Sequence, residues 1–481
     1  MCVYAQRHAW VKKPRRQRPS ARSGRGTMAS QQPRRLRASI SCNDDGSKGR
    51  RHLWLAELAA TLGAMSYGLS VGYSSPALPD MRQRLHFTAD QSSWFGSLLN
   101  IGALVGGLTG GQSIRYLGRR YTLLATAAVH TAGWVLIAAG SAPWALLLGR
   151  TLTGVATGAV ALTVPVFVSE VSPKNMRGLL DTVCTMAITF GILAAYVMGK
   201  WLHYNILAAA CIVPAVAMAA ILPTLAGSPR WLLQMGREES ALSALQFYRG
   251  QDVTEEFNAM RQGVAAVAGA KSSLTLAQLS LPGVYKPFLY TLAALFLQQF
   301  SGIVVMLFYT HDIFAAAGTS LSAPDSAIIV GAAQVVCVGL ATRLTDRVGR
   351  RPLMLFSLAV SCASLAALGS FYHFKRTLGP GFVGLSPLPS ILMGEMLPMH
   401  VKGPATSLLI AFYFACGTVI AKEYGDMLRA FGDDGLYWFF ASFMAAGFLF
   451  VAVFLPETKG KTLEEIAHIF GSGSSLPGSG S

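Results

Sequence analysis

The sequence predicts an all-α polytopic membrane protein, on the evidence of its composition and of a repeated hydrophobic pattern. Of the 481 residues, 52% are hydrophobic and 13% are charged, whereas soluble domains carry about 25% charged residues. Crossing a bilayer takes roughly 20 mostly apolar residues. Nearly uncharged runs recur twelve times, most of them apolar on every side rather than amphipathic: 53–78, 93–113, 121–141, 143–168, 182–199, 205–225, 287–311, 326–342, 353–372, 378–394, 404–421 and 436–455.

The formal net charge of +17 does not point to nucleic acid, because much of it lies in one tail. Residues 1–43 carry eleven Lys or Arg and no acidic residue. A run of one charge sign is typical of a solvated segment, so we expect 1–51 to be a basic, disordered tail. Lys and Arg are also more frequent in the loops on the side of this tail, and the positive-inside rule then places both termini in the cytoplasm.

Charged elements recur in the two halves of the chain. "RYLGRRYT" (115–122) pairs with "TDRVGRRP" (345–352), "PVFVSEVSPKNMRG" (165–178) with "PSILMGEMLPMHVKG" (389–403), and "SPRWLLQMGREES" (228–240) with "PETKGKTLEEI" (456–466). The offset is about 225 to 231 residues each time, which indicates duplication of a six-span unit.

This duplication predicts five parts. They are the tail 1–51, an N-terminal six-helix bundle over 52–226, a cytoplasmic linker over 227–286 with a surface helix in "GREESALSALQFYRG", a C-terminal six-helix bundle over 287–458, and a cytoplasmic tail over 459–481. The tenth span looks shortened, because Lys375 and Arg376 precede it closely and three prolines interrupt its 17 residues.

The repeated charges predict a cytoplasmic gate. Arg–carboxylate pairs near the membrane surface can link helix ends and hold one conformation closed, although simple topology anchoring by positive charge is the alternative. The predicted gate residues are Arg119, Arg120, Glu170, Arg177, Asp346, Arg350, Arg351 and Glu395.

Taken together, several motifs resemble the sugar-porter branch of the major facilitator superfamily. They are "LGRR", "DRVGRR", "GRTLTG", "PVFVSEVSPKNMRG", "SPRWLL", "QQFSGI" and "PETKGKTLEEI", and the likeness runs from about Leu53 to Phe470. Within that branch the chain is most similar to the class III facilitative hexose transporters, members six and eight. The resemblance implies a transporter rather than an enzyme, two six-helix bundles, a hexose substrate carried through a central cavity, and no cofactor.

A sugar presents hydroxyls and apolar C–H faces, so its site within a bilayer needs neutral amides and flat apolar surface rather than fixed charge. Gln298 and Gln299 lie in the seventh span and Gln334 in the eighth. Helix–helix hydrogen bonding is the alternative role for these amides. The resemblance assigns all three to sugar contacts, with Ile188 and Ile192 as an apolar wall.

Further site positions follow from the resemblance. Tyr309 is an outer-gate aromatic or else a core aromatic. Thr185 stands where the family usually has Gln, Val304 where it has Asn, and Tyr413-Phe414 where it has Asn-Trp. Thr185 and Tyr413 are therefore added to the predicted substrate site, and these departures reduce its number of polar groups.

Passive uniport of glucose or a related hexose is the expected activity, because Ser70 stands where proton symporters of the family have Asp. A proton-coupled sugar symporter, a non-transporting sugar sensor and an inactive splice form are the alternatives. The expected partners are a hexose and the lipid bilayer, without nucleic acid and without a required oligomer. The expected location is the plasma membrane or a lysosomal or endosomal membrane.

Overall fold

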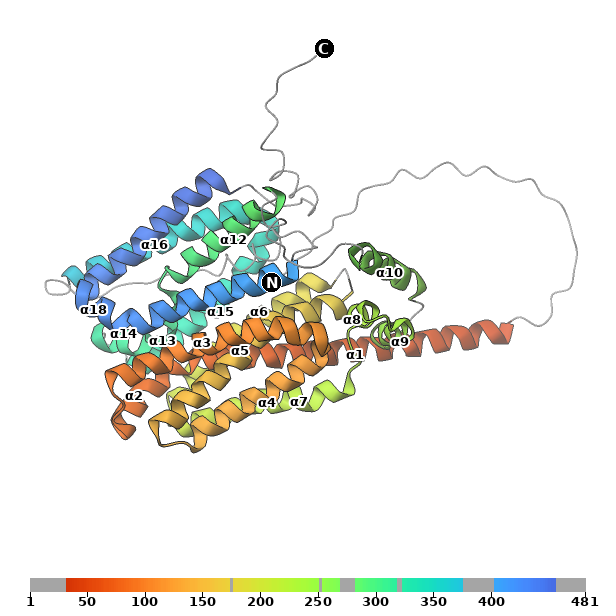
Figure 1. The fold of residues 1–481 in the computed structure, drawn as a ribbon, viewed down its shortest axis with the longest axis horizontal. Coiled ribbons are helices and arrows are strands. Elements are labelled where there is room, and N and C mark those ends of the chain that lie inside the picture. The colour runs from red at the N-terminus through yellow and green to blue at the C-terminus, as the bar shows by residue number, and fades with distance from the viewer. Residues whose placement is uncertain are drawn as a thin grey trace, which may run out of the picture.

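The computed structural model describes residues 32–173, 176–250, 253–268, 282–317, 322–374 and 402–455, and the regular elements within these ranges are all helices. Figure 1 shows them as a bundle of long helices with a group of shorter ones at one end. The first half contains α1 (Gln32–Gly72), α2 (Ser74–Leu85), α3 (Ala89–Tyr116), α4 (Gly118–Ala139), α5 (Pro143–Val171), α6 (Arg177–Gly199) and α7 (Tyr204–Ile221). The linker contains α8 (Pro229–Gln234), α9 (Glu238–Arg249) and α10 (Thr254–Ala268), and the second half contains α12 (Pro282–Gln299), α13 (Ile303–Phe308), α14 (Thr310–Ala317), α15 (Ala323–Val348), α16 (Arg350–Phe374) and α18 (Lys402–Phe454).

Seven of the described helices are long and apolar enough to cross a membrane: α4, α5, α6, α7 with the turn that follows it, α15, α16 and α18. The 53-residue α18 is interrupted at Gly432, whose φ of 73° and ψ of 173° are not helical, and so it spans both of the last two predicted runs. These helices confirm the predicted all-α, multi-pass membrane fold. The predicted tenth span, 378–394, lies outside the described residues.

The first helix begins earlier than predicted. It starts at Gln32, within the segment 1–51 that the charge pattern predicts to be disordered. In Figure 1 the near part of this extension lies beside α9, and its far end runs past that helix. A Cβ on Gly49 would lie 2.5 Å from the carbonyl carbon of Arg249, and the His52 ring stacks on Phe247 at 3.8 Å. Contact with α9 thus supports the helix beyond the apolar run, and α9 itself is the predicted linker helix.

Glycines bring α3 and α5 together at backbone distance. A Cβ on Gly106 would lie 1.9 Å from the Val155 carbonyl oxygen, and one on Gly158 would lie 1.9 Å from that of Ala103. Small residues four apart permit such close approach between membrane helices, and no larger side chain fits at these two positions. The position of α3 relative to α5 is therefore tightly fixed.

The predicted seventh span is broken into α12, α13 and α14. Gly302 separates the first two with a φ of +77°, a left-handed conformation that favours glycine. A Cβ there would also lie 3.0 Å from the Phe440 ring on α18. Broken helices are tolerated in membranes where they line a cavity, and the break directly follows Gln298 and Gln299.

Candidate binding cavity

A cavity of about 610 Å³ lies between the two halves of the molecule. Helices α1, α3, α5 and α6 line it from the first half, and α12, α13, α14, α15 and α18 line it from the second. Its volume is within the range of about 300–1,000 Å³ that is typical of small-molecule pockets. No Asp, Glu, Lys or Arg is among the lining residues that the structure describes. Such a cavity suits a neutral ligand.

Seven of the eight residues predicted for the substrate site line this cavity: Thr185, Ile188, Ile192, Gln298, Gln299, Gln334 and Tyr413. The eighth, Tyr309, is not among the described lining residues. Its hydroxyl donates to the Ala421 carbonyl over 3.2 Å, and its ring stacks on Tyr424 at 4.6 Å. This side chain joins α13 to α18 beside the cavity.

The glutamines present uncommitted oxygens. The Oε1 atoms of Gln298, Gln299 and Gln334 are buried and have no hydrogen-bond partner within the part of the chain that the structure describes. The Gln299 amide nitrogen donates to the Tyr413 carbonyl over 2.7 Å, which fixes that side chain. An unsatisfied buried polar atom costs about 1–3 kcal/mol, so hydroxyl groups of a ligand or waters would stabilise these oxygens.

Asn100 is a fourth cavity amide, which the sequence-based site does not contain. It lies on α3, is 5% exposed and lines the cavity, and its Nδ2 has no partner among the described residues. The signal in the sequence is similar to that of the glutamines, since Asn100 is an amide in the middle of the apolar run 93–113.

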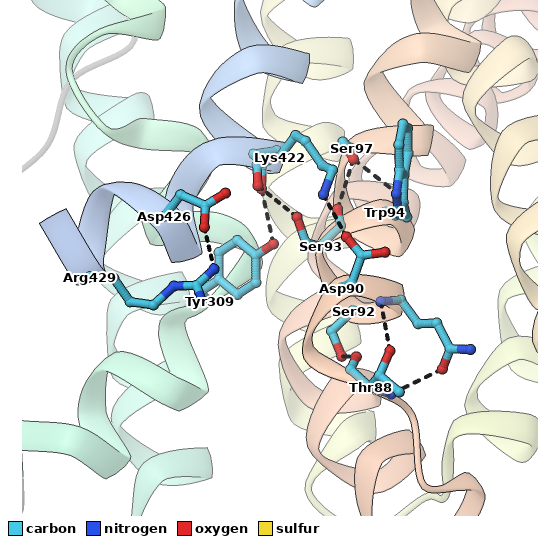
Figure 2. Close-up of polar contacts among 12 residues, drawn as sticks. Thr88, Asp90, Ser92, Ser93, Trp94, Ser97, Tyr309, Lys422, Asp426 and Arg429 are labelled. Carbon is cyan, nitrogen blue, oxygen red and sulfur yellow. Dashed lines mark hydrogen bonds and ion pairs between the residues drawn. The ribbon is translucent and has the colours of Figure 1, made fainter.

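Three ion pairs join the two halves at the end of the bundle that carries α2 and α14. Arg82 pairs with Asp312 and Lys200 with Asp325, each at 2.5 Å, and Lys422 with Asp90 at 2.7 Å. Figure 2 shows Lys422 of α18 directed at Asp90 of α3, with Ser93 Oγ donating to the Lys422 carbonyl over 2.6 Å. We call these three pairs the outer clasp.

At the opposite end, a buried network joins α4, α5 and α8. Arg119 Nη2 donates to Glu170 Oε1 over 2.7 Å, and Ser228 Oγ donates to Glu170 Oε2 over 2.5 Å. Other predicted gate residues have backbone partners, since Arg120 donates to the Pro223 carbonyl over 2.8 Å and Arg351 to that of Ala452 over 2.6 Å. Arg177 begins α6. The side chains of Asp346 and Arg350, and all of Glu395, lie outside the described residues.

The comparisons with known proteins agree on one family. A family model described as "Sugar (and other) transporter" matches residues 56–470. The chain belongs to this sugar transporter family. It is 35% identical over 445 residues to the facilitated trehalose transporter Tret1 of Anopheles gambiae, a match that covers 86% of this chain and 56% of that protein.

Two further comparisons are informative. Over 467 residues the chain is 34% identical to solute carrier family 2, facilitated glucose transporter member 8, of Bos taurus, covering 88% of this chain and 95% of that protein. The proton:xylose symporter XylE, solved with 6-bromo-6-deoxy-D-glucose, matches with a TM-score of 0.70 and 22% identity over 87% of this chain and 99% of that chain. The predicted family and the membrane transporter class are thereby confirmed, and the XylE likeness supports the fold.

A buried arginine of this sugar transporter lies behind the cavity wall. Arg150 is fully buried, and its guanidinium donates to the carbonyls of Ser70 (2.8 Å) and Phe95 (3.3 Å) and to the hydroxyl of Ser74. His130 Nε2 lies 2.8 Å from Ser70 Oγ. These described partners of Arg150 are neutral oxygens, and no carboxylate is among them.

Proposed function

We propose that this sugar transporter carries a monosaccharide, most directly glucose or a related hexose, by facilitated diffusion with alternating access. The observation that supports it best is the set of unpartnered amide atoms in a mostly apolar, uncharged cavity. Such a surface matches the hydroxyls and C–H faces of a sugar ring. A disaccharide is the second candidate, because relatives of this chain are named trehalose transporters.

Alternating access in two-bundle carriers is a rocking of the bundles about a fixed central site. The outer clasp joins residues of the first half to residues of the second half on one side of the cavity. The described pair Arg119–Glu170 at the other end lies within the first half. This asymmetry supports a state that is closed at the clasp end, and opening that end requires the three pairs to separate.

Uniport is proposed over proton symport because of the surroundings of Arg150. Ion-coupled carriers use a titratable group within the membrane close to the substrate. The contacts of Arg150 are with hydroxyl and carbonyl oxygens, and the described cavity lining contains no acid. A proton-coupled symporter and a non-transporting sensor are the alternatives for the test.

We propose that both termini lie in the cytoplasm, on the positive-inside argument. The proposed location of the protein is the plasma membrane or a lysosomal or endosomal membrane. We propose that transport needs no oligomer, because residues of one chain line the cavity from both halves.

Uptake by the purified protein in proteoliposomes tests this function. Radiolabelled glucose and trehalose are supplied separately, each with and without a proton gradient. We expect saturable glucose uptake that runs down the glucose gradient and does not respond to the proton gradient. Uptake stimulated by protons would establish symport, binding without uptake would establish a sensor, and preference for trehalose would establish the disaccharide.

A further inference from the structure

The first-half wall of the cavity is poor in free hydrogen-bond donors. The hydroxyls of Thr157, Thr185 and Thr189 line it, but each donates to a carbonyl of its own helix over 2.7, 3.0 and 2.8 Å respectively. Asn100 lines the same wall, and its Nδ2 is a buried donor with no partner in the part of the chain that the structure describes. Asn100 is therefore the first-half carboxamide that is available to a ligand.

Asn100 lies next to a glutamine of the other half. A Cβ on Gly417 of α18 would lie 2.3 Å from Gln299 Nε2 and 3.3 Å from Asn100 Nδ2, so both amide nitrogens surround the same small space. The Gln299 nitrogen is bound to the Tyr413 carbonyl, whereas the Asn100 nitrogen has no partner among the described residues. The first half thus offers a free donor close to the Gln299 carboxamide of the second half.

The position of Asn100 is rigid. The next residues of α3 carry Gly102, where a Cβ would lie 2.3 Å from the Thr151 carbonyl oxygen, and Gly106 makes the same type of contact one turn further. Because α3 is fixed against α5 at these glycines, the backbone of Asn100 cannot move away from the cavity without separating the two helices. A fixed backbone position lowers the cost of ordering the site when a ligand binds.

We propose that Asn100 positions the sugar from the first half, with its Nδ2 donating to one hydroxyl of the ring. Other hydroxyls of the same ring donate to the Oε1 atoms of the α12 glutamines, Gln298 and Gln299. The inference rests on the proposed function and adds to it a specificity residue. It accounts for a cavity in which an apolar and an aromatic side chain, Val304 and Tyr413, occupy positions where the resemblance leads one to expect asparagine. A sugar held in this way contacts both halves, so its binding energy favours their approach.

The test is equilibrium binding of glucose and of its monodeoxy analogues to the purified full-length protein. Asn100→Leu removes the amide and keeps a similar side-chain volume. We expect it to weaken glucose binding by about 3- to 10-fold, the effect of losing one neutral hydrogen bond. One deoxy analogue, which lacks the hydroxyl that Asn100 contacts, should bind the wild type and the variant equally well.

The control is Thr109→Ala, on the exposed face of the same helix, where the hydroxyl donates only to the Val105 and Gly106 carbonyls. Asn100→Ala is the second variant, to be used if the leucine lowers the melting temperature. Unchanged glucose affinity in the variant, or a loss that is equal for glucose and every deoxy analogue, would overturn the role of Asn100 while leaving glucose transport intact. A wild type that binds no sugar would refute the proposed function and this inference together.

Discussion

The Arg119–Glu170 pair gives the most direct prediction about stability. Both side chains are 8% exposed, and the carboxylate accepts from Arg119 at 2.7 Å and from Ser228 at 2.5 Å. Glu170→Gln leaves the arginine buried without its counter-charge, and breaking a buried pair in this way costs about 3–5 kcal/mol. Ser228→Ala removes one hydrogen bond to a charged acceptor and should cost about 1.5–3 kcal/mol.

Thermal unfolding in detergent, followed by tryptophan fluorescence, measures this difference as the shift in melting temperature. The matched control is Glu238→Gln, because its partner Arg261 lies 3.3 Å away and the two side chains are 52% and 58% exposed. An exposed pair contributes about 0–1 kcal/mol, so its loss should shift the melting temperature little. If Glu170→Gln and Glu238→Gln lower the melting temperature equally, the burial argument is wrong.

Two more predictions concern residues of α18, Gly417 and Lys422. Gly417→Ala should weaken glucose binding by about 3- to 10-fold, because the added methyl would lie 2.3 Å from Gln299 Nε2. The control is Gly425→Ala, whose methyl meets nothing within 4 Å, and this variant should bind glucose with wild-type affinity. Lys422→Gln should open the clasp end. Two cysteines line the cavity, Cys184 and Cys337, and an impermeant thiol reagent should label them about 2- to 5-fold faster in this variant. Arg429→Gln is the control, since its partner Asp426 is on its own helix (Figure 2); equal labelling of the two variants would contradict a clasp.

The local hydrophobic pattern predicted the membrane helices because each apolar run is long enough to identify a membrane helix from that segment of sequence alone. The same reasoning selected Gln298, Gln299 and Gln334, which the structure brings to one cavity. Asn100 carries a similar signal, but an amide within an apolar run does not reveal which face of its helix meets the cavity. The sequence-based site therefore lacks Asn100.

Contacts between distant segments could not be predicted. Arg82 and Asp312 are 230 residues apart, and Lys422 and Asp90 are 332 residues apart. Nothing in a local pattern indicates such pairs, because they depend on how the two halves pack. The contact of α1 with α9 at Gly49 and His52 is of the same kind, since α9 lies about 200 residues further along the chain.

Glucose counterflow tests the central claim most directly, that a neutral cavity between the two halves carries a sugar. Proteoliposomes loaded with unlabelled glucose and diluted into labelled glucose, without a proton gradient, should accumulate label transiently above equilibrium. The wild type should show this overshoot, and Gln298→Leu, which changes only a cavity amide, should reduce it strongly. Wild-type vesicles that show no overshoot, or a Gln298→Leu variant that matches the wild type, would contradict the account.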